Sequence, residues 1–430
     1  MIASMPRGRA FFLAILLSIS VLSYWSFDSH IRPAFSSAAS GFYPPSPQVP
    51  ADHTVDTTFG SDGASILLVS AFFPLSKSKH TMNDYNTWLA LFLKPITTPI
   101  YFFTTPEMAP MIRALRGDLP ITINTTYASA FETAPLLGLE DEYEDMWRRD
   151  RERRIHSPEL YSVWAAKPFF LDEGLKNAKG RFKYAFWTDA GSFRNPHQYT
   201  AWPDAQRVED VWQEGSRETG TRADELFFVP SQGTPHGSMQ YWNEGMGPID
   251  NEISEDTADV LTNRTGSFFG GSAAAIHWWR KIYYAYHDAY LRQGVFVGKD
   301  QPLINAIMML NPKRFISVWA SDPAPQLSSS DHGLAKRAES SPLGLCGANW
   351  YYYEFFLASK AEQAAMADQW NKEWSSMLTK FRPWKGAWWT GNLATEGRGL
   401  CRVTRVMAME KLFRRVLGDG WTAPPSQIYH

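Results

Sequence analysis

An unbroken apolar run from Ser65 to Phe73, SILLVSAFF, is the feature that most constrains the fold. Strands with one solvated face alternate apolar and polar residues, whereas a continuous run is typical of a parallel strand buried on both faces. Two more apolar runs, Pro99 to Thr104 and Tyr184 to Thr188, have the same character. Because helical patterns separate these runs, we expect an α/β fold with a mixed, mostly parallel sheet and flanking helices.

The remaining elements follow from periodicity and turn residues. The expected helices are Tyr85 to Leu93, Met108 to Leu115, Glu140 to Arg154, Leu160 to Lys176, Ala273 to Leu291 and Asp300 to Met309. Acidic residues come first and basic residues last in Glu140 to Arg154, as a helix dipole favours, and its arginines either face solvent or bind phosphate. A short strand is expected at Pro120 to Asn124. Trp202 to Asp256 is predicted to form long loops around a site, with a short strand at Leu226 to Val229.

Composition excludes some partners and favours others. Hydrophobic residues make up 44% and charged residues 20% of the 430 residues, which is typical of a folded globular protein. The formal net charge of -2 gives no basic surplus for binding nucleic acid. Aromatic residues reach 15%, with 18 tryptophans. Most of these rings are expected in the core, and the others suit stacking on sugars or nucleobases.

The N-terminus carries a predicted single membrane anchor. Residues 10–27 are almost uncharged and apolar, and are long enough to cross a bilayer at the short end of the usual range. Arg7 and Arg9 precede this run, which predicts a cytosolic tail at residues 1–9 and a luminal body, in the ER or Golgi. A cleaved signal peptide is the alternative, since residues 36–40 are small. The Tyr24 and Trp25 pair suits a membrane interface and favours an anchor that is retained.

Four further segments follow the anchor. Residues 28–63 scatter prolines among Ser, Ala and Asp and are expected to form an extended stem. Residues 64–320 are predicted to be the catalytic domain, residues 321–343 a Ser/Pro-rich loop, and residues 344–430 a C-terminal extension packed on that domain.

Two cysteines and two sequons bear on the compartment. Cys346 and Cys401 are too few and too widely spaced for a zinc module, and would form a disulfide in an oxidising lumen or stay buried thiols in cytosol. Asn124 and Asn263 begin Asn-x-Thr sequons, which would be glycosylation sites in the lumen.

Asp189 stands at the end of a predicted buried strand, in the segment Phe186 to Arg194, FWTDAGSFR. In open α/β sheets, ligands bind at the carboxyl ends of the strands. A carboxylate there can hold a divalent cation on a diphosphate, Gly191 permits close backbone approach, and Arg194 can pair with phosphate bidentately. The simpler interpretation is an aspartate that caps a turn and a surface arginine.

Two later segments could complete the site. Gly270 and Gly271 follow an apolar pair and could let the backbone approach a ligand, although an ordinary turn explains them equally well. Asp300 and Gln301 open a predicted helix. Asp300 could be its N-cap, or a general base that holds the acceptor hydroxyl.

These segments, in this order, resemble the HtrL/YibB-like family of glycosyltransferase-like proteins. The similarity spans roughly Ser65 to Phe315. It is carried by Leu68 to Phe73, Tyr85 with Trp88, Pro99 to Thr104, Trp164 to Phe169, Trp187 to Gly191, Phe269 to Gly271, and Asp300 with Gln301. The Trp-x-Asp-x-Gly element together with the later Asp-Gln is the most specific part.

The resemblance implies a GT-A-like, Rossmann-type fold, a nucleotide-sugar donor and Mn²⁺ or Mg²⁺. Asp189 corresponds to the acidic element that binds metal in such enzymes, where the usual Asp-x-Asp has a second acid in place of Gly191. The expected donor-binding residues are Ser70, Ala71, Phe72, Lys167, Trp187, Asp189 and Arg194. Gly270, Gly271 and Gln301 would form the acceptor side, with Asp300 at the reacting hydroxyl. Stabilising the departing diphosphate would be the main catalytic demand.

The resulting hypothesis is a membrane-anchored glycosyltransferase that moves a sugar to a glycan or glycolipid. A non-catalytic luminal carbohydrate-binding protein is the alternative, and the many aromatic residues and the single acid at Asp189 are compatible with it. A glycoside hydrolase needs two facing carboxylates, which Asp189 and Asp300 could supply, but a lone acid at a strand end followed by glycine suits a phosphate site better.

Overall fold

A sheet of eight strands lies at the centre of the part of the chain that the structure describes, with the order β3-β2-β1-β4-β6-β5-β7-β8. The strands are β1 (Ile66–Phe72), β2 (Ile100–Thr104), β3 (Ile121–Asn124), β4 (Tyr184–Thr188), β5 (Phe227–Phe228), β6 (Phe268–Ser272), β7 (Phe315–Ser317) and β8 (Met407–Ala408). β1 pairs parallel with β2 and β4, β2 with β3, and β5 with β7. β6 runs antiparallel to β4 and β5, and β8 antiparallel to β7. The expectation of a mixed, mostly parallel α/β sheet is confirmed.

This computed structural model describes residues 66–78, 80–231, 235–249, 267–319, 322, 352–381 and 405–429, all within one compact unit of residues 55–430. The predicted tail, anchor and stem, most of the 321–343 loop, Asn263, Cys346 and Cys401 lie outside these residues. Within the described ranges, no helix combines the length and apolar character needed to cross a membrane.

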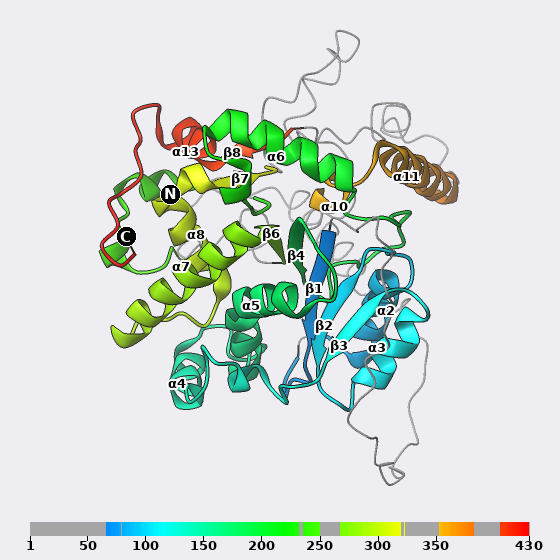
Figure 1. Ribbon diagram of the computed structural model, residues 1–430, viewed down its shortest axis with the longest axis horizontal. Coiled ribbons are helices and arrows are strands. Elements are labelled where there is room, and N and C mark those ends of the chain that lie inside the picture. Colours follow the sequence, from blue (N-terminus) through cyan, green and yellow to red (C-terminus); the bar gives the residue numbers. More distant parts are fainter. Residues whose placement is uncertain are drawn as a thin grey trace, which may run out of the picture. The chain divides into compact units, whose positions relative to one another are not determined.

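Helices cover both faces of the sheet (Figure 1). Side chains of α5 (Pro158–Asn177), α7 (Ala273–Arg292), α8 (Asp300–Leu310) and α13 (Met409–Leu417) share one buried cluster with one face. Those of α2 (Met82–Leu93), α3 (Ala109–Arg116), α6 (Ala205–Thr219) and α10 (Tyr352–Phe356) share a second cluster with the other face. The described elements also include α4 (Glu140–Arg149) and α11 (Lys360–Phe381).

β1 shows why its sequence, which is apolar except for the buried Ser70, does not alternate between apolar and polar residues. Leu67 and Val69 belong to the cluster on the α5 and α7 face, whereas Ile66 and Leu68 belong to the cluster on the α2 and α6 face. All seven residues of the strand are buried. Burying both faces leaves no position where a polar side chain could reach water, so the period of two disappears from the sequence.

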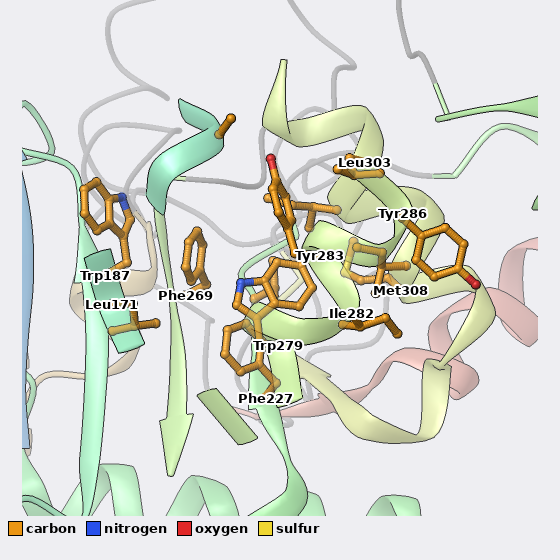
Figure 2. Close-up of a cluster of buried hydrophobic side chains, with 14 of the residues drawn as sticks. Leu171, Trp187, Phe227, Phe269, Trp279, Ile282, Tyr283, Tyr286, Leu303 and Met308 are labelled. Carbon is orange, nitrogen blue, oxygen red and sulfur yellow. The ribbon is translucent and has the colours of Figure 1, made fainter. Parts of the chain in front are cut away.

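An aromatic layer joins the sheet to α7, as Figure 2 shows. Trp187 of β4 stacks on Phe269 of β6 at 6.5 Å between ring centroids, and Trp279 of α7 lies 4.9 Å from Phe227 of β5. These rings are almost completely buried. Many aromatic residues of the chain are thus core residues, as the composition predicts.

The glycines of β6 allow the strand to pack closely. Gly270 and Gly271 pair with β4 on one side and β5 on the other. A Cβ atom at Gly270 would lie 2.1 Å from the carbonyl oxygen of Ala185, and one at Gly271 would lie 2.7 Å from that of Leu226. A side chain at either position would therefore require the neighbouring strand to move.

Two expectations about helices need correction. Within Trp202 to Asp256, expected to be loops apart from a short strand, residues 205–219 form α6, which Asp204 caps and Gly220 ends in the left-handed region at φ 70°. Its buried face has helical spacing, which the Gly- and acid-rich surroundings obscured: Val208, Val211, Trp212 and Gly215. The helix expected over Glu140 to Arg154 ends at Arg149, because Asp150 adopts an extended backbone and anchors a turn.

The C-terminal part contributes to the sheet itself. β8 extends it beyond β7, and α13 packs beside α8 and β7. Arg405, just before β8, pairs with Asp322 through two hydrogen bonds of 2.6 and 2.8 Å. The described residues after position 344 therefore add a strand to the sheet and side chains to its buried clusters.

Candidate active site

A cavity of about 440 Å³ opens at the carboxyl ends of β1 and β4. Its walls come from the segment after β1, the start of α2, the N-terminal half of α5, the turn after β4 and the first residues of α8. The polar side chains among its lining residues are Ser78, His80, Tyr85, His156, Trp164, Lys167, Trp187, Asp189, Arg194, Ser267, Asp300 and Gln301. This is the edge at which ligands bind in open α/β sheets.

The position of Asp189 is fixed by its neighbours in the turn after β4. Its backbone N–H donates to the carbonyl of Ser267 at 2.9 Å, and its own carbonyl accepts from Ser192 at 3.0 Å. The indole Nε1 of Trp187 donates to Asp189 Oδ1 at 2.6 Å. The side chain is 33% exposed, so the carboxylate is held in place and still reaches the cavity.

Lys167 joins Asp189 to Asp300 across the cavity floor. Its Nζ lies 3.2 Å from Asp189 Oδ1 and 2.9 Å from Asp300 Oδ2. The side chains of Lys167 and Asp300 are each only 4% exposed. Asp189 and Asp300, which are 111 positions apart in the sequence, thus meet at one ammonium group. We call Asp189, Lys167 and Asp300 the acid–lysine–acid cluster.

Burial and charge shift the pKa values of this cluster. Burial alone would lower the pKa of Lys167, but the two carboxylates outweigh it and the pKa is raised. For Asp300, burial raises the pKa and the negative charge of Asp189 adds to the rise, while Lys167 opposes both. The pKa of Asp300 therefore lies above the ordinary range of an aspartate, which suits a group that accepts a proton.

Gly191 and Arg194 complete the wall beside Asp189. A Cβ atom at Gly191 would lie 3.2 Å from Cε3 of Trp88, which is closer than most Cβ atoms lie to a neighbouring atom. The guanidinium of Arg194 stacks over the Trp88 ring at 4.3 Å from its centroid. Arg194 Nε also donates to the carbonyl of Gly191 at 3.0 Å. Position 191, where the Asp-x-Asp pattern has its second acid, therefore lies beside the indole of Trp88 and the guanidinium of Arg194.

Asp189 and Asp300 do not form a pair of acids that could hold a divalent cation, because the Lys167 ammonium lies between them. A cation shared by Asp189 and Asp300 would occupy the position that Lys167 Nζ holds, and would be repelled by that ammonium. The expectation of Mn²⁺ or Mg²⁺ at Asp189 stays a prediction, and these side chains do not support it.

A second group, Asp150, Glu152 and His156, has spacing that could hold a metal ion. The side chains of this group already form ion pairs with one another and with Lys299. Lys299 Nζ lies 2.7 Å from Glu152 Oε2 and 3.8 Å from Asp150 Oδ1, and His156 Nδ1 lies 2.8 Å from Asp150 Oδ2. A lysine thus supplies the positive charge here too.

His156 is a cavity residue that the sequence analysis missed. Asp150 accepts from the hydroxyl of Tyr161 and from the backbone N–H of Glu152, and it orients the His156 ring through Nδ1. Although burial raises the pKa of Asp150, the hydrogen bonds from His156 and Tyr161 hold it well below the ordinary range. The only signal in the sequence was the position of His156 beside the Ser157-Pro158 start of α5.

The other expected residues divide into two groups. Ala71, Phe72, Trp187 and Gln301 line the cavity together with the cluster and Arg194. Ser70, Gly270 and Gly271 are not among its lining residues, so the structure does not place the two glycines on an acceptor side. Asn124 ends β3 half-buried, and its amide donates to the Tyr101 hydroxyl at 3.0 Å.

No protein-family model matches this chain, and no curated protein matches it in sequence. Membership of the HtrL/YibB-like family therefore stays a prediction from the motifs.

Similar solved structures include sugar transferases. Core-mannan synthase A from Aspergillus fumigatus, in a Mn/GDP form, shares 12% identity over 61% of this chain and 74% of its own, with a TM-score of 0.35. Mouse xyloside xylosyltransferase 1 shares 10% identity over 63% of this chain and 91% of its own, with a TM-score of 0.32. The 4-diphosphocytidyl-2C-methyl-D-erythritol synthase from Anaerococcus prevotii shares 11% identity over 65% of this chain and 100% of its own, with a TM-score of 0.28. Likenesses this weak identify neither a donor nor an acceptor.

Proposed function

We propose that this chain is a glycosyltransferase that moves a sugar from a nucleotide-diphosphate donor to a glycan or glycolipid acceptor. The observation that carries the proposal is the acid–lysine–acid cluster on the floor of a cavity at the carboxyl ends of β1 and β4. This edge of an α/β sheet suits a nucleotide, and the cavity is large enough for a small ligand.

Each group of the cluster has a chemical role in this proposal. The bond between the anomeric carbon and the diphosphate oxygen breaks, and the acceptor oxygen forms the new bond. Arg194 stabilises the negative charge that develops on the leaving diphosphate, and Lys167 offsets the negative charge of Asp189 and Asp300 beside it. Asp300 lies near the acceptor hydroxyl and accepts its proton. Asp189 keeps Lys167 in place and presents its exposed side to the donor.

The position of Lys167 argues against a glycoside hydrolase. Such enzymes place two carboxyl groups on either side of the scissile bond, with space for the sugar between them. Here the ammonium of Lys167 lies between Asp189 and Asp300, in ion-pair contact with both. A glycosidic bond cannot occupy the same space.

A donor screen tests the proposal. The purified full chain, kept in detergent, is incubated with a panel of UDP-, GDP- and CMP-sugars, and the released nucleotide is measured. We expect one donor class to be turned over. Asp189→Asn should reduce that turnover, because the neutral amide no longer holds the Lys167 ammonium in place. The reduction should be on the order of 100-fold or more if a metal-bound diphosphate is the leaving group. Asp300→Asn should also reduce turnover while leaving donor binding largely intact.

Asp118→Asn is the matched control, because Asp118 is an exposed carboxylate in the turn before β3 and should leave turnover unchanged. A chain that releases no nucleotide but binds free oligosaccharides would favour the non-catalytic alternative. Turnover by Asp189→Asn at the parent rate would remove the cluster from the mechanism.

The compartment is also part of the proposal. Arg7 and Arg9 before residues 10–27 support a cytosolic N-terminus and a luminal catalytic domain on an ER or Golgi membrane. In intact microsomes, added protease should leave everything beyond about residue 30 protected. Digestion of the globular part without detergent would contradict this topology.

A further inference from the structure

We propose that the cavity binds the diphosphate of its nucleotide without a divalent cation, with Lys167 in place of a cation between the two carboxylates and Arg194 as the built-in counter-charge to the phosphates. The inference rests on the proposed function, because it concerns the same nucleotide site. Three observations support it. Each concerns a position at which a metal-dependent site would have a metal ion or a second acid.

First, an ammonium takes the position of the shared cation. Two carboxylates that face each other in a buried site repel one another unless positive charge lies between them. Lys167 Nζ supplies that charge at 3.2 Å from Asp189 Oδ1 and 2.9 Å from Asp300 Oδ2. The side chain comes from the middle of α5 and is almost completely buried, so the chain provides this cation permanently.

Second, packing opposes a second acid next to Asp189. The Cβ atom of any side chain at position 191 would approach Cε3 of Trp88 to 3.2 Å. Trp88 is held in turn by edge contacts with His80 and Tyr85, at 4.7 and 5.4 Å between ring centroids. A side chain at this position would require the Trp88 ring to shift by a few tenths of an ångström.

Third, a guanidinium lies beside the position of the missing acid. Arg194 is exposed, stacks on Trp88 and hydrogen-bonds the carbonyl of Gly191. Guanidinium groups match phosphate oxygens with two parallel hydrogen bonds, and stacking on a ring restricts the side chain before the ligand arrives. The cavity wall next to Gly191 therefore carries a guanidinium, that of Arg194, which can bind phosphate.

Calorimetry with UDP, GDP, ADP and CDP as probes tests this inference on the full chain, once with excess EDTA and once with MnCl₂. We expect one of these nucleotides to bind with dissociation constants that agree within about threefold in the two buffers. Arg194→Gln should weaken that binding by about tenfold or more, the scale of a charge-assisted hydrogen bond, and should affect the matching nucleoside monophosphate much less. Arg194→Lys should retain part of the affinity.

Arg181→Gln is the matched control. Arg181 is an exposed arginine before the start of β4, whereas Asp189 follows its end, so its loss should not change nucleotide affinity. Arg194 is exposed as well, so its variants should fold, and circular dichroism checks this.

The outcomes separate the inference from the proposed function. Binding that EDTA abolishes and Mn²⁺ restores would overturn the metal-independent site and leave the nucleotide site standing. Equal binding by Arg194→Gln and the parent chain would remove Arg194 from the inference and overturn it. If none of the four nucleotides binds in either buffer, the proposed function fails, and this inference fails with it.

Discussion

Lys167 Nζ lies 2.9 Å from Asp300 Oδ2, and both side chains are almost completely buried. A buried ion pair of this kind contributes little net stability by itself, because desolvating the two charges offsets much of their attraction. Its value lies in what it positions. Lys167 ties α5 to the start of α8 and to the turn after β4, which brings together three segments distant in sequence.

Removing the cation should destabilise the fold in a pH-dependent way. Lys167→Met leaves Asp189 and Asp300 without the charge between them, and should lower the free energy of unfolding by about 3–5 kcal/mol at pH 7. Losing Lys167 raises the pKa of Asp300 further, so the folded state takes up a proton as pH falls and the deficit shrinks. Urea denaturation at about pH 5 and pH 7 measures both effects.

The double variant Lys167→Met, Asp300→Leu is the control for this prediction. It removes both buried charges and should regain most of the lost stability. A single Lys167→Met variant as stable as the parent chain at pH 7 would show that the cluster is not buried as described.

Turnover should fall on acidification because of Asp300. As a base, Asp300 accepts a proton only when ionised, and burial together with Asp189 raises its pKa. The acid limb of kcat should therefore lie above the ordinary range of an aspartate, in a profile recorded from about pH 4 to 8. Asp300→Asn should lose this limb from its residual turnover. An unchanged limb in that variant would assign it to another group.

Asp150 should hold the cavity wall through His156. Asp150→Asn removes the charge that receives three hydrogen bonds, and should lower the free energy of unfolding by about 1–3 kcal/mol. Since the pKa of Asp150 is depressed in the folded state, this contribution is present at neutral pH and is lost as pH falls through the depressed value. The effect of Asp150→Asn should accordingly diminish in acid, whereas Tyr161→Phe should cost less at either pH.

His156→Gln tests whether that wall contacts the bound molecule. We expect a higher KM for the donor or the acceptor with little change in stability, since the ring nitrogen that faces Asp150 is replaced by an amide. A parent-like KM for both substrates would make His156 a structural residue only.

Gly270→Ala should disrupt the sheet. The new Cβ would meet the Ala185 carbonyl at 2.1 Å, where only backbone movement could relieve the overlap. We expect a loss of about 3 kcal/mol or more, measured by thermal unfolding. Gly237→Ala is the matched control, because nothing lies within 4 Å of its added Cβ. Equal melting temperatures for the two variants would contradict the strand pairing.

The luminal topology makes a separate prediction for Cys346 and Cys401. In an oxidising compartment they should form one disulfide, whose loss would cost about 2–5 kcal/mol. Mass spectrometry of unreduced peptides from the native protein identifies the linked pair. Two free, alkylatable thiols would argue against a luminal body.

Local patterns were sufficient for much of the sheet. Tyr184 to Thr188 was predicted as a strand with the bounds that β4 has, because apolar runs bounded by turn residues depend little on distant parts of the chain. The close backbone contact at Gly270 was not predictable in the same way. A Gly-Gly pair permits either a ligand or a neighbouring strand to approach, and only the sheet order decides between them.

The site was predictable residue by residue but not as an arrangement. Asp189, Lys167 and Asp300 were each singled out from strand-end and helix-start positions and from the resemblance. Their meeting at one ammonium depends on how α5 and α8 pack, which no local pattern contains. The Asp150 to His156 pair was missed for a different reason: Asp150 was placed inside a helix expected to reach Arg154, whereas α4 ends at Arg149.

The most direct test of this account is a crystal structure of the chain with the nucleoside diphosphate that binds most tightly, grown in EDTA. We predict phosphate oxygens within hydrogen-bond distance of the Arg194 guanidinium, with Asp189 and Asp300 still paired to Lys167. A nucleotide bound away from the carboxyl ends of β1 and β4 would contradict the proposed donor site.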